Sequence, residues 1–175
     1  MRVAFIIGHH EKSKGAYSPH LETTEYELYR SLECELEEIG DVYKHDPSII
    51  GYTTRCKEIS KRIGDKYDII VALHFNSGGG KGGTEVFYWH TNRVGRQIAK
   101  FISEEYSKDM DIINRGAKPY TKRTQRGAAE VFYPKGTVVL FEPFFGDNEK
   151  DCSKWDPYKL FKVLERVKNK EWVSK

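Results

Sequence analysis

Three apolar stretches of the sequence each lead into a residue that can bind a metal ion or move a proton. The stretches span residues 3–7, 69–73 and 137–141, and they are followed by His9, His74 and Glu142. Continuous apolar runs of this length, rich in β-branched residues, are typical of strands buried on both faces. In an open α/β sheet, ligands bind beyond the carboxyl ends of the strands. We therefore expect these three side chains to meet at one edge of a sheet.

A fourth candidate, Glu25, lies in the first turn of a predicted helix. Thr24 with Glu27 three residues later forms a capping-box pattern, which places the start of the helix at this point. The helix continues as one apolar stripe that reaches Ile39. The helix dipole favours an acid in the first turn, so Glu25 is either a structural acid or part of the site.

Two imidazoles and a carboxylate are a standard ligand set for a catalytic zinc ion that keeps an open position. A further carboxylate beside such an ion can act as general base and acid toward a water molecule. His9 and His74 would supply the imidazoles, and Glu25 and Glu142 the two carboxylates. The sequence contains no HExxH, so the pattern of helical zinc proteases is absent. The same ligand set also suits other divalent ions.

Each of these residues has a competing interpretation. His10 follows His9, and strand alternation sends the two side chains to opposite sides, so only one of them can face the site. Glu22 and Glu27 lie close enough to compete with Glu25. A carboxylate at the end of an apolar run costs several kcal/mol if it is buried unpaired, so Glu142 alternatively forms a salt bridge to an arginine.

Helices and strands alternate along the rest of the chain, which indicates the α/β class. Further strands are predicted at 41–45, 84–89 and 128–133, and further helices at 53–63, from Asn92 onward and at 157–167. Residues 109–126 are expected to form a loop with one short strand. Asn76 is expected either to contact substrate or to cap a turn, whereas His20, His45 and His90 follow no pattern and are expected to be solvated.

Composition narrows the class of protein. A chain of 175 residues is most simply one domain, and a net charge of +3 is too weak to argue for nucleic acid. The three cysteines are far apart and odd in number, which argues against disulfides and thiolate zinc sites. No apolar run is long enough for a transmembrane helix, and no signal peptide is recognisable. We expect a protein made in a cytoplasm without its own export signal.

These residues resemble a known family, the zinc-dependent N-acetylmuramoyl-L-alanine amidases of type 3. Five segments are similar to that family and occur in its order. They are Ile-Ile-Gly-His9 with Gly15-Ala16 and Glu25, Val-Ala-Leu-His74-Phe-Asn76, Gly83-Thr-Glu-Val-Phe-Tyr88, Asn114-Arg-Gly116, and Val138-Val-Leu-Phe-Glu142 with the following Pro-Phe-Phe-Gly-Asp-Asn148. The resemblance spans residue 3 to about residue 168.

The resemblance implies a single α/β domain over residues 1–175, with a central mixed, mainly parallel sheet between helices. It implies one zinc ion held by His9, Glu25 and His74, with Glu142 as the catalytic residue. The substrate would be peptidoglycan, cut at the amide bond between N-acetylmuramic acid and L-alanine. The basic residues from Lys118 to Arg126 then either meet anionic wall polymer or form a solvated loop face.

The sequence departs from the family pattern in places. His10-Glu11 replaces the usual small residues after His9, and Pro143 follows Glu142. No cell-wall-binding domain is recognisable, and we expect a monomer. With no export signal either, we expect a compact phage endolysin that reaches the wall from the host cytoplasm. A zinc peptidase or carboxypeptidase on a related scaffold, and a wall-binding module without catalysis, are the alternative functions.

Overall fold

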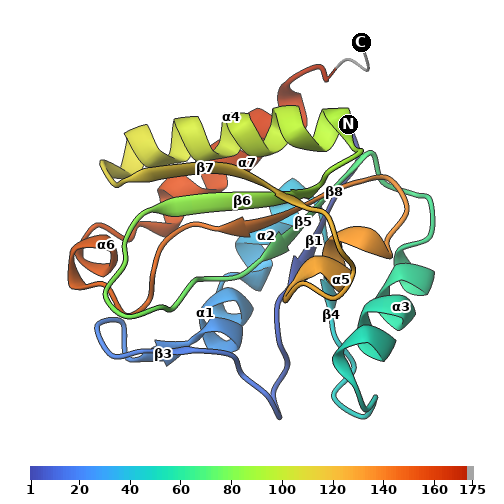
Figure 1. Ribbon diagram of the computed structural model, residues 1–175, viewed down its shortest axis with the longest axis horizontal. Helices are drawn as coiled ribbons and strands as arrows, with labels where there is room; N and C mark the ends of the chain where they lie inside the picture. Colours follow the sequence, from blue (N-terminus) through green and yellow to red (C-terminus); the bar gives the residue numbers. More distant parts are fainter. Residues whose placement is uncertain (173–175) are drawn as a thin grey trace.

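The structure, a computed structural model, describes residues 1–172 and has a six-stranded sheet at its centre (Figure 1). The sheet order is β4-β1-β5-β8-β6-β7, formed by β1 (Val3–Ile7), β4 (Asp41–Lys44), β5 (Ile69–Leu73), β6 (Thr84–Trp89), β7 (Asn114–Tyr120) and β8 (Thr137–Glu142). All neighbouring strands are parallel except β6 and β8, which are antiparallel. A separate two-stranded ribbon pairs β2 (Tyr17–Ser18) with β3 (Thr23–Thr24). The predicted mixed, mainly parallel sheet is confirmed.

Helices cover both faces of the sheet. They are α1 (Glu25–Ser31), α2 (Glu33–Ile39), α3 (Tyr52–Ile63), α4 (Arg93–Met110), α5 (Ala128–Phe132), α6 (Glu149–Ser153) and α7 (Pro157–Asn169). One hydrophobic cluster joins the sheet to α1, α2, α4 and α7, and a second joins its other face to α3 and α5. This gives three layers, helix–sheet–helix, in a single α/β domain (Figure 1). The predicted domain range ends at residue 175, so its last three residues lie outside the described part.

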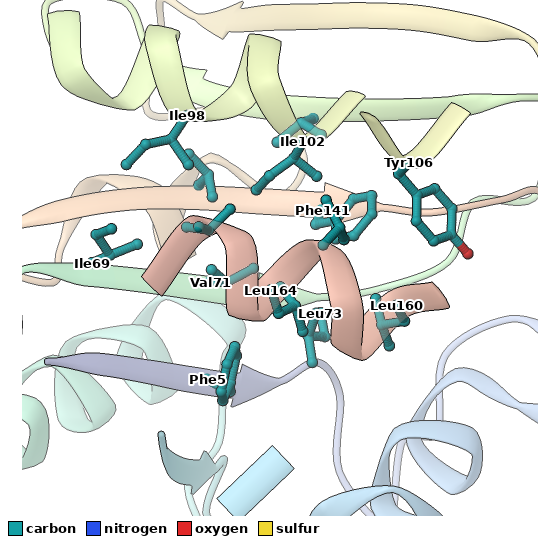
Figure 2. Packing of buried hydrophobic residues seen from close by; sticks show 14 of the residues in the cluster. Phe5, Ile69, Val71, Leu73, Ile98, Ile102, Tyr106, Phe141, Leu160 and Leu164 are labelled. Atoms are coloured by element: carbon teal, nitrogen blue, oxygen red, sulfur yellow. The ribbon is translucent and has the colours of Figure 1, made fainter. Parts of the chain in front are cut away.

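The apolar runs of the central strands alternate between these two clusters. Phe5, Val71 and Phe141 point to the side of α4 and α7, where Ile102 and Leu164 pack near them (Figure 2). Their sequence neighbours point to the α3 and α5 side, as Ile6, Ile70 and Leu140 do. Because side chains alternate along a strand, residues two positions beyond Ala72 and Leu140, namely His74 and Glu142, are directed toward the α3 and α5 side.

Two predicted elements are wrong. Residues 128–133, predicted as a strand, form helix α5, because Ala128 and Val131 bury the same face at helical spacing against the second cluster. A short apolar run does not distinguish these two structures by periodicity. The single helix predicted from Thr24 to Ile39 is divided at Leu32, whose ψ of 10° ends α1 and begins α2.

Smaller differences concern element ends. Helix α3 starts after Gly51 rather than after Thr53 or Thr54, and the strand expected within 109–126 is β7, seven residues long. Helix α7 extends two residues past the predicted end. All three cysteines are free thiols, as expected. Within residues 1–172, every helix falls short of the length or apolarity that crossing a bilayer requires.

Candidate metal centre

His9, Glu25 and His74 meet at one point. Each offers one ligand atom, and the three atoms lie within 4.8 Å of one another. Glu25 Oε2 is 3.1 Å from His74 Nδ1 and 3.2 Å from His9 Nε2. The two imidazole rings stand edge to face with centroids 5.2 Å apart. The structure thus brings the three predicted ligands together, while their role in binding a metal stays a prediction.

The sheet register explains why the two histidines and Glu142 are neighbours. Ile7 pairs with Leu73, and Leu73 pairs with Phe141, so the three strands end level with one another. The backbone N–H of His74 donates to the carbonyl of Phe141 at 3.0 Å. Parallel strands that end level place the residues after them at one edge.

His9 has an unusual backbone conformation. Its φ of 65° lies in the left-handed region, which is rare for a residue with a β-carbon and costs of the order of 1–3 kcal/mol. At this residue the backbone turns away from the direction of β1. The His9 imidazole lies beside Glu25, and 25% of the His9 side chain is exposed. The strain is therefore stored at the point where the predicted ligands meet.

Two glycines leave room for the ligand side chains. A β-carbon on Gly8 would lie 2.4 Å from the His74 ring, so this position has to be glycine for His74 to occupy its place. A β-carbon on Gly15 would lie 2.6 Å from the His9 ring and 2.8 Å from Glu25 Oε1. The packing around the three ligands is thus set by the backbone of one connection, between β1 and β2.

Glu25 is fixed from several directions. Thr24 forms the predicted capping box with Glu27, which sets the start of α1, and Glu25 is 3% exposed. Its Oε1 accepts from the backbone N–H of Ala16 at 2.8 Å. Burial alone would raise the pKa of Glu25, but hydrogen bonds to His74 and His9 outweigh burial and lower the pKa to about 2. Glu25 is therefore an anion whose Oε2 faces both imidazoles.

The competing residues lie elsewhere. His10 is buried, but its ring is not part of the cluster, and Nδ1 has no hydrogen-bond partner among residues 1–172. Glu27 is exposed and bonded to Thr24, and Glu22 is exposed. Of the alternatives left open by the sequence, His9 and Glu25 are thus the ones near His74.

Glu142 lies beside the cluster without a bond to it. Its Oε2 is buried and has no hydrogen-bond partner in the described part of the chain, so the alternative of a salt bridge to arginine is not what the structure shows. Burial raises the pKa of Glu142 to about 8; the nearby Glu25 carboxylate acts in the same direction, and His74 opposes it. A buried carboxyl that holds a proton near neutral pH suits general acid–base work.

Comparison with known proteins decides the family. The family model described as N-acetylmuramoyl-L-alanine amidase matches residues 3–159. The chain belongs to this amidase family. Consequently it is an enzyme that hydrolyses the amide bond between N-acetylmuramic acid and L-alanine in peptidoglycan.

Solved structures share the fold of the amidase. The catalytic domain of the CD27L endolysin targeting Clostridia Difficile is 21% identical with a TM-score of 0.76, and the match covers 99% of each chain. Cwp6 from Clostridium difficile is 19% identical with a TM-score of 0.75, over 96% of this chain but 28% of the longer Cwp6 chain. The catalytic domain of CwlV from Bacillus (Paenibacillus) polymyxa is 18% identical with a TM-score of 0.70, over 97% and 95%. Among curated proteins no match was found.

The residues of the amidase fit a zinc ion. Two imidazoles and a carboxylate within reach of one point match the three-ligand catalytic set, and Glu25 supplies the negative charge. Three protein ligands leave a fourth position open for water or substrate. The unpartnered Oε2 of Glu142 is a buried acceptor that a water in that position could satisfy.

A second buried carboxylate, Glu130, was missed by the sequence reasoning. It lies on α5, is fully buried, and bonds to His74 and His45. His45, expected to be solvated, is 5% exposed, so that prediction is wrong. Its position after β4, at the same sheet edge, explains the burial. A lone acid inside the apolar run 128–132 was the available signal, because such an acid needs a partner.

A third buried carboxylate, Glu85, organises the neighbouring loop. It pairs across the sheet with Glu142 in the register of β6 and β8. Its side chain accepts from Asn76 Nδ2 and Arg115 Nε, both at 2.6 Å, and from Lys118. Asn76 therefore braces the turn after β5, and Lys118, at the start of the basic segment, forms an ion pair with Glu85.

Proposed function

We propose that the amidase is a zinc enzyme in which His9, Glu25 and His74 hold the ion and Glu142 moves the proton. The single observation that carries the proposal is the juxtaposition of this three-ligand cluster with the Glu142 carboxyl, whose buried Oε2 has no hydrogen-bond partner within residues 1–172. Zinc held there would supply a Lewis acid that polarises the scissile carbonyl and lowers the pKa of water from about 16 to about 7.

The chain's own residues account for the proton transfers. A zinc ion held beside Glu142 would favour its ionised form, so that Glu142 Oε2 can take one proton from the attacking water as the water oxygen bonds to the lactyl carbonyl carbon. The same oxygen then delivers that proton to the alanine nitrogen as the carbon–nitrogen bond breaks. The products are a muramic acid lactyl carboxylate and a peptide with a free N-terminal alanine. Glu25 and Glu142 are two acids at the site whose pKa values are shifted in opposite directions.

Two variants test the roles separately. Glu142→Gln keeps the shape of the side chain and removes the proton acceptor, so we expect normal zinc content and a loss of activity of about 10²–10⁴-fold. Glu25→Gln removes the charge of a proposed ligand, so we expect loss of both bound zinc and activity. Zinc content by mass spectrometry and product analysis on purified peptidoglycan measure the two effects. An active Glu142→Gln protein would refute the role of Glu142.

Product analysis also separates the amidase from a zinc peptidase. The amidase releases peptides whose new N-terminus is the L-alanine next to the lactyl group, whereas a peptidase cuts between two amino acids. The family match favours the first outcome. A wall-binding module without catalysis would leave all these bonds intact, and the retention of all four proposed site residues argues against it.

We further propose that the protein is bacteriolytic and of phage origin, acting as an endolysin. Support comes from the similarity over nearly all of both chains to the CD27L endolysin catalytic domain. Loss of turbidity of a suspension of bacterial walls, with and without a chelator, tests this activity and its zinc dependence together. That the domain works as a monomer and after synthesis in the host cytoplasm stays a prediction.

A further inference from the structure

Glu130 lies between two histidines that come from different strands. Its Oε2 is 2.7 Å from His74 Nε2, and its Oε1 is 2.9 Å from His45 Nε2. The carboxylate is 0% exposed, and the side chains of His74 and His45 are 10% and 2% exposed. Both carboxylate oxygens of Glu130 are therefore hydrogen-bonded. The side chains of His74, Glu130 and His45 form a continuous buried hydrogen-bond network that begins at the proposed metal ligands.

The two ring nitrogens of His74 face different partners. Its Nδ1 faces Glu25 in the cluster, at 3.1 Å, and its Nε2 faces Glu130. A neutral imidazole carries one N–H, so ligation of a metal by Nδ1 requires that the proton sit on Nε2. That proton then donates to Glu130. The acceptor thus selects the tautomer that presents the lone pair of His74 to the ion.

His45 holds the other end of Glu130. Its Nδ1 has no hydrogen-bond partner among residues 1–172, so its proton is placed on Nε2, where it donates to Glu130 Oε1. Two donors from β4 and β5 therefore converge on one carboxylate of α5. Because Glu130 is bound at both oxygens, it has no freedom to rotate away from His74.

Charge supports the same arrangement. An ionised carboxylate buried beside neutral imidazoles costs several kcal/mol unless positive charge lies nearby. A divalent ion held by His9, Glu25 and His74 would supply that charge, and Glu25 with Glu130 would balance it. Carboxylate–histidine–metal arrangements of this kind fix ring orientation and raise ligand basicity.

We propose that Glu130 is a positioning residue for the metal site, anchored by His45, which orients His74 and strengthens its hold on zinc without touching the ion or the substrate. This inference rests on the proposed zinc ligands. It assigns a task to a buried carboxylate that the proton transfers described above leave unused. It also explains why α5 carries an acid at a fully buried position.

The test measures zinc affinity directly, by competition with a chromophoric chelator, on Glu130→Gln, Glu130→Ala and His45→Asn. Asp151→Asn is the matched control, because Asp151 is a buried carboxylate bonded to Gly83 N and Phe145 N, away from the cluster. We expect zinc to bind about 10–100-fold more weakly in both Glu130 variants, less so in His45→Asn, and normally in Asp151→Asn. The visible spectrum of the cobalt-substituted protein should change in the Glu130 variants alone.

The outcomes separate the two proposals. Wild-type zinc affinity and an unchanged cobalt spectrum in Glu130→Gln, with a melting temperature lowered as in Asp151→Asn, would show a purely structural role and overturn the inference. If Glu130→Ala does not fold, the nearly isosteric Glu130→Gln and His45→Asn still decide it. A wild-type protein that binds no zinc would instead overturn the metal site itself.

Discussion

Glu25 Oε2 and His74 Nδ1 are 3.1 Å apart although 49 residues separate them in the sequence. The contact joins the first turn of α1 to the end of β5, and His9 reaches the same oxygen from β1. Three elements therefore meet through one carboxylate atom. A cation placed there would replace these contacts with ligand bonds and tie the three elements together.

Removal of the metal should lower the stability of the fold. Anything that binds the native state alone stabilises it, by about 4 kcal/mol at a free concentration 1,000 times the dissociation constant. We expect the melting temperature to fall when zinc is chelated and to recover when zinc is restored. In His74→Ala the chelator should have no effect on the melting temperature. The free energy of unfolding of the metal-free variant should be lower than that of the metal-free wild type by about 3–5 kcal/mol, because Glu130 loses a partner. Calorimetry of both proteins checks this, and a chelator effect that persists in the variant would speak against His74 as a ligand.

Stability of the zinc-free protein should depend on pH through Glu142. Its pKa is raised from 4.5 in the unfolded chain to about 8, so between these values the native state holds a proton that the unfolded state has lost. Wild-type stability then falls as pH rises through this range, by up to about 1.4 kcal/mol per pH unit. Glu142→Gln carries no such proton, so its stability relative to wild type should increase from pH 5 to pH 8. Urea titrations at four pH values measure the difference, and a constant difference would show that Glu142 is ionised throughout.

Gly8→Ala should disturb the site without touching a ligand residue. The added β-carbon would lie 2.4 Å from the His74 ring, which has to move. We expect a loss of about 1–3 kcal/mol of stability from overpacking, together with weaker zinc binding and lower activity. Gly78→Ala is the control, since its β-carbon would meet Phe145 at an ordinary 3.6 Å. Equal zinc affinities in the two variants would mean that His74 is not held where the structure has it.

Most of the site could be predicted from sequence patterns within single strands. The runs ending near His9, His74 and Glu142 were recognisable because strands buried on both faces are apolar throughout. Their meeting at one edge followed from parallel pairing. The capping box likewise located Glu25 correctly at the start of α1.

Residues whose role depends on distant neighbours were not predictable in this way. Glu130 and His45 are 85 residues apart, and nothing local in either segment indicates that they touch. The strand predicted over residues 128–133 is instead helix α5, because so short a run does not show a period that separates the two structures. The break at Leu32 falls in a segment without glycine or proline, so no local signal indicates it.

The most direct measurement is anomalous X-ray scattering at the zinc edge from a crystal of the zinc-loaded protein. The account predicts one strong peak about 2.0–2.2 Å from His9 Nε2, a Glu25 carboxylate oxygen and His74 Nδ1, with the carboxyl group of Glu142 beside the open position. A peak elsewhere, or imidazoles of His9 and His74 that bind separate ions, would contradict it.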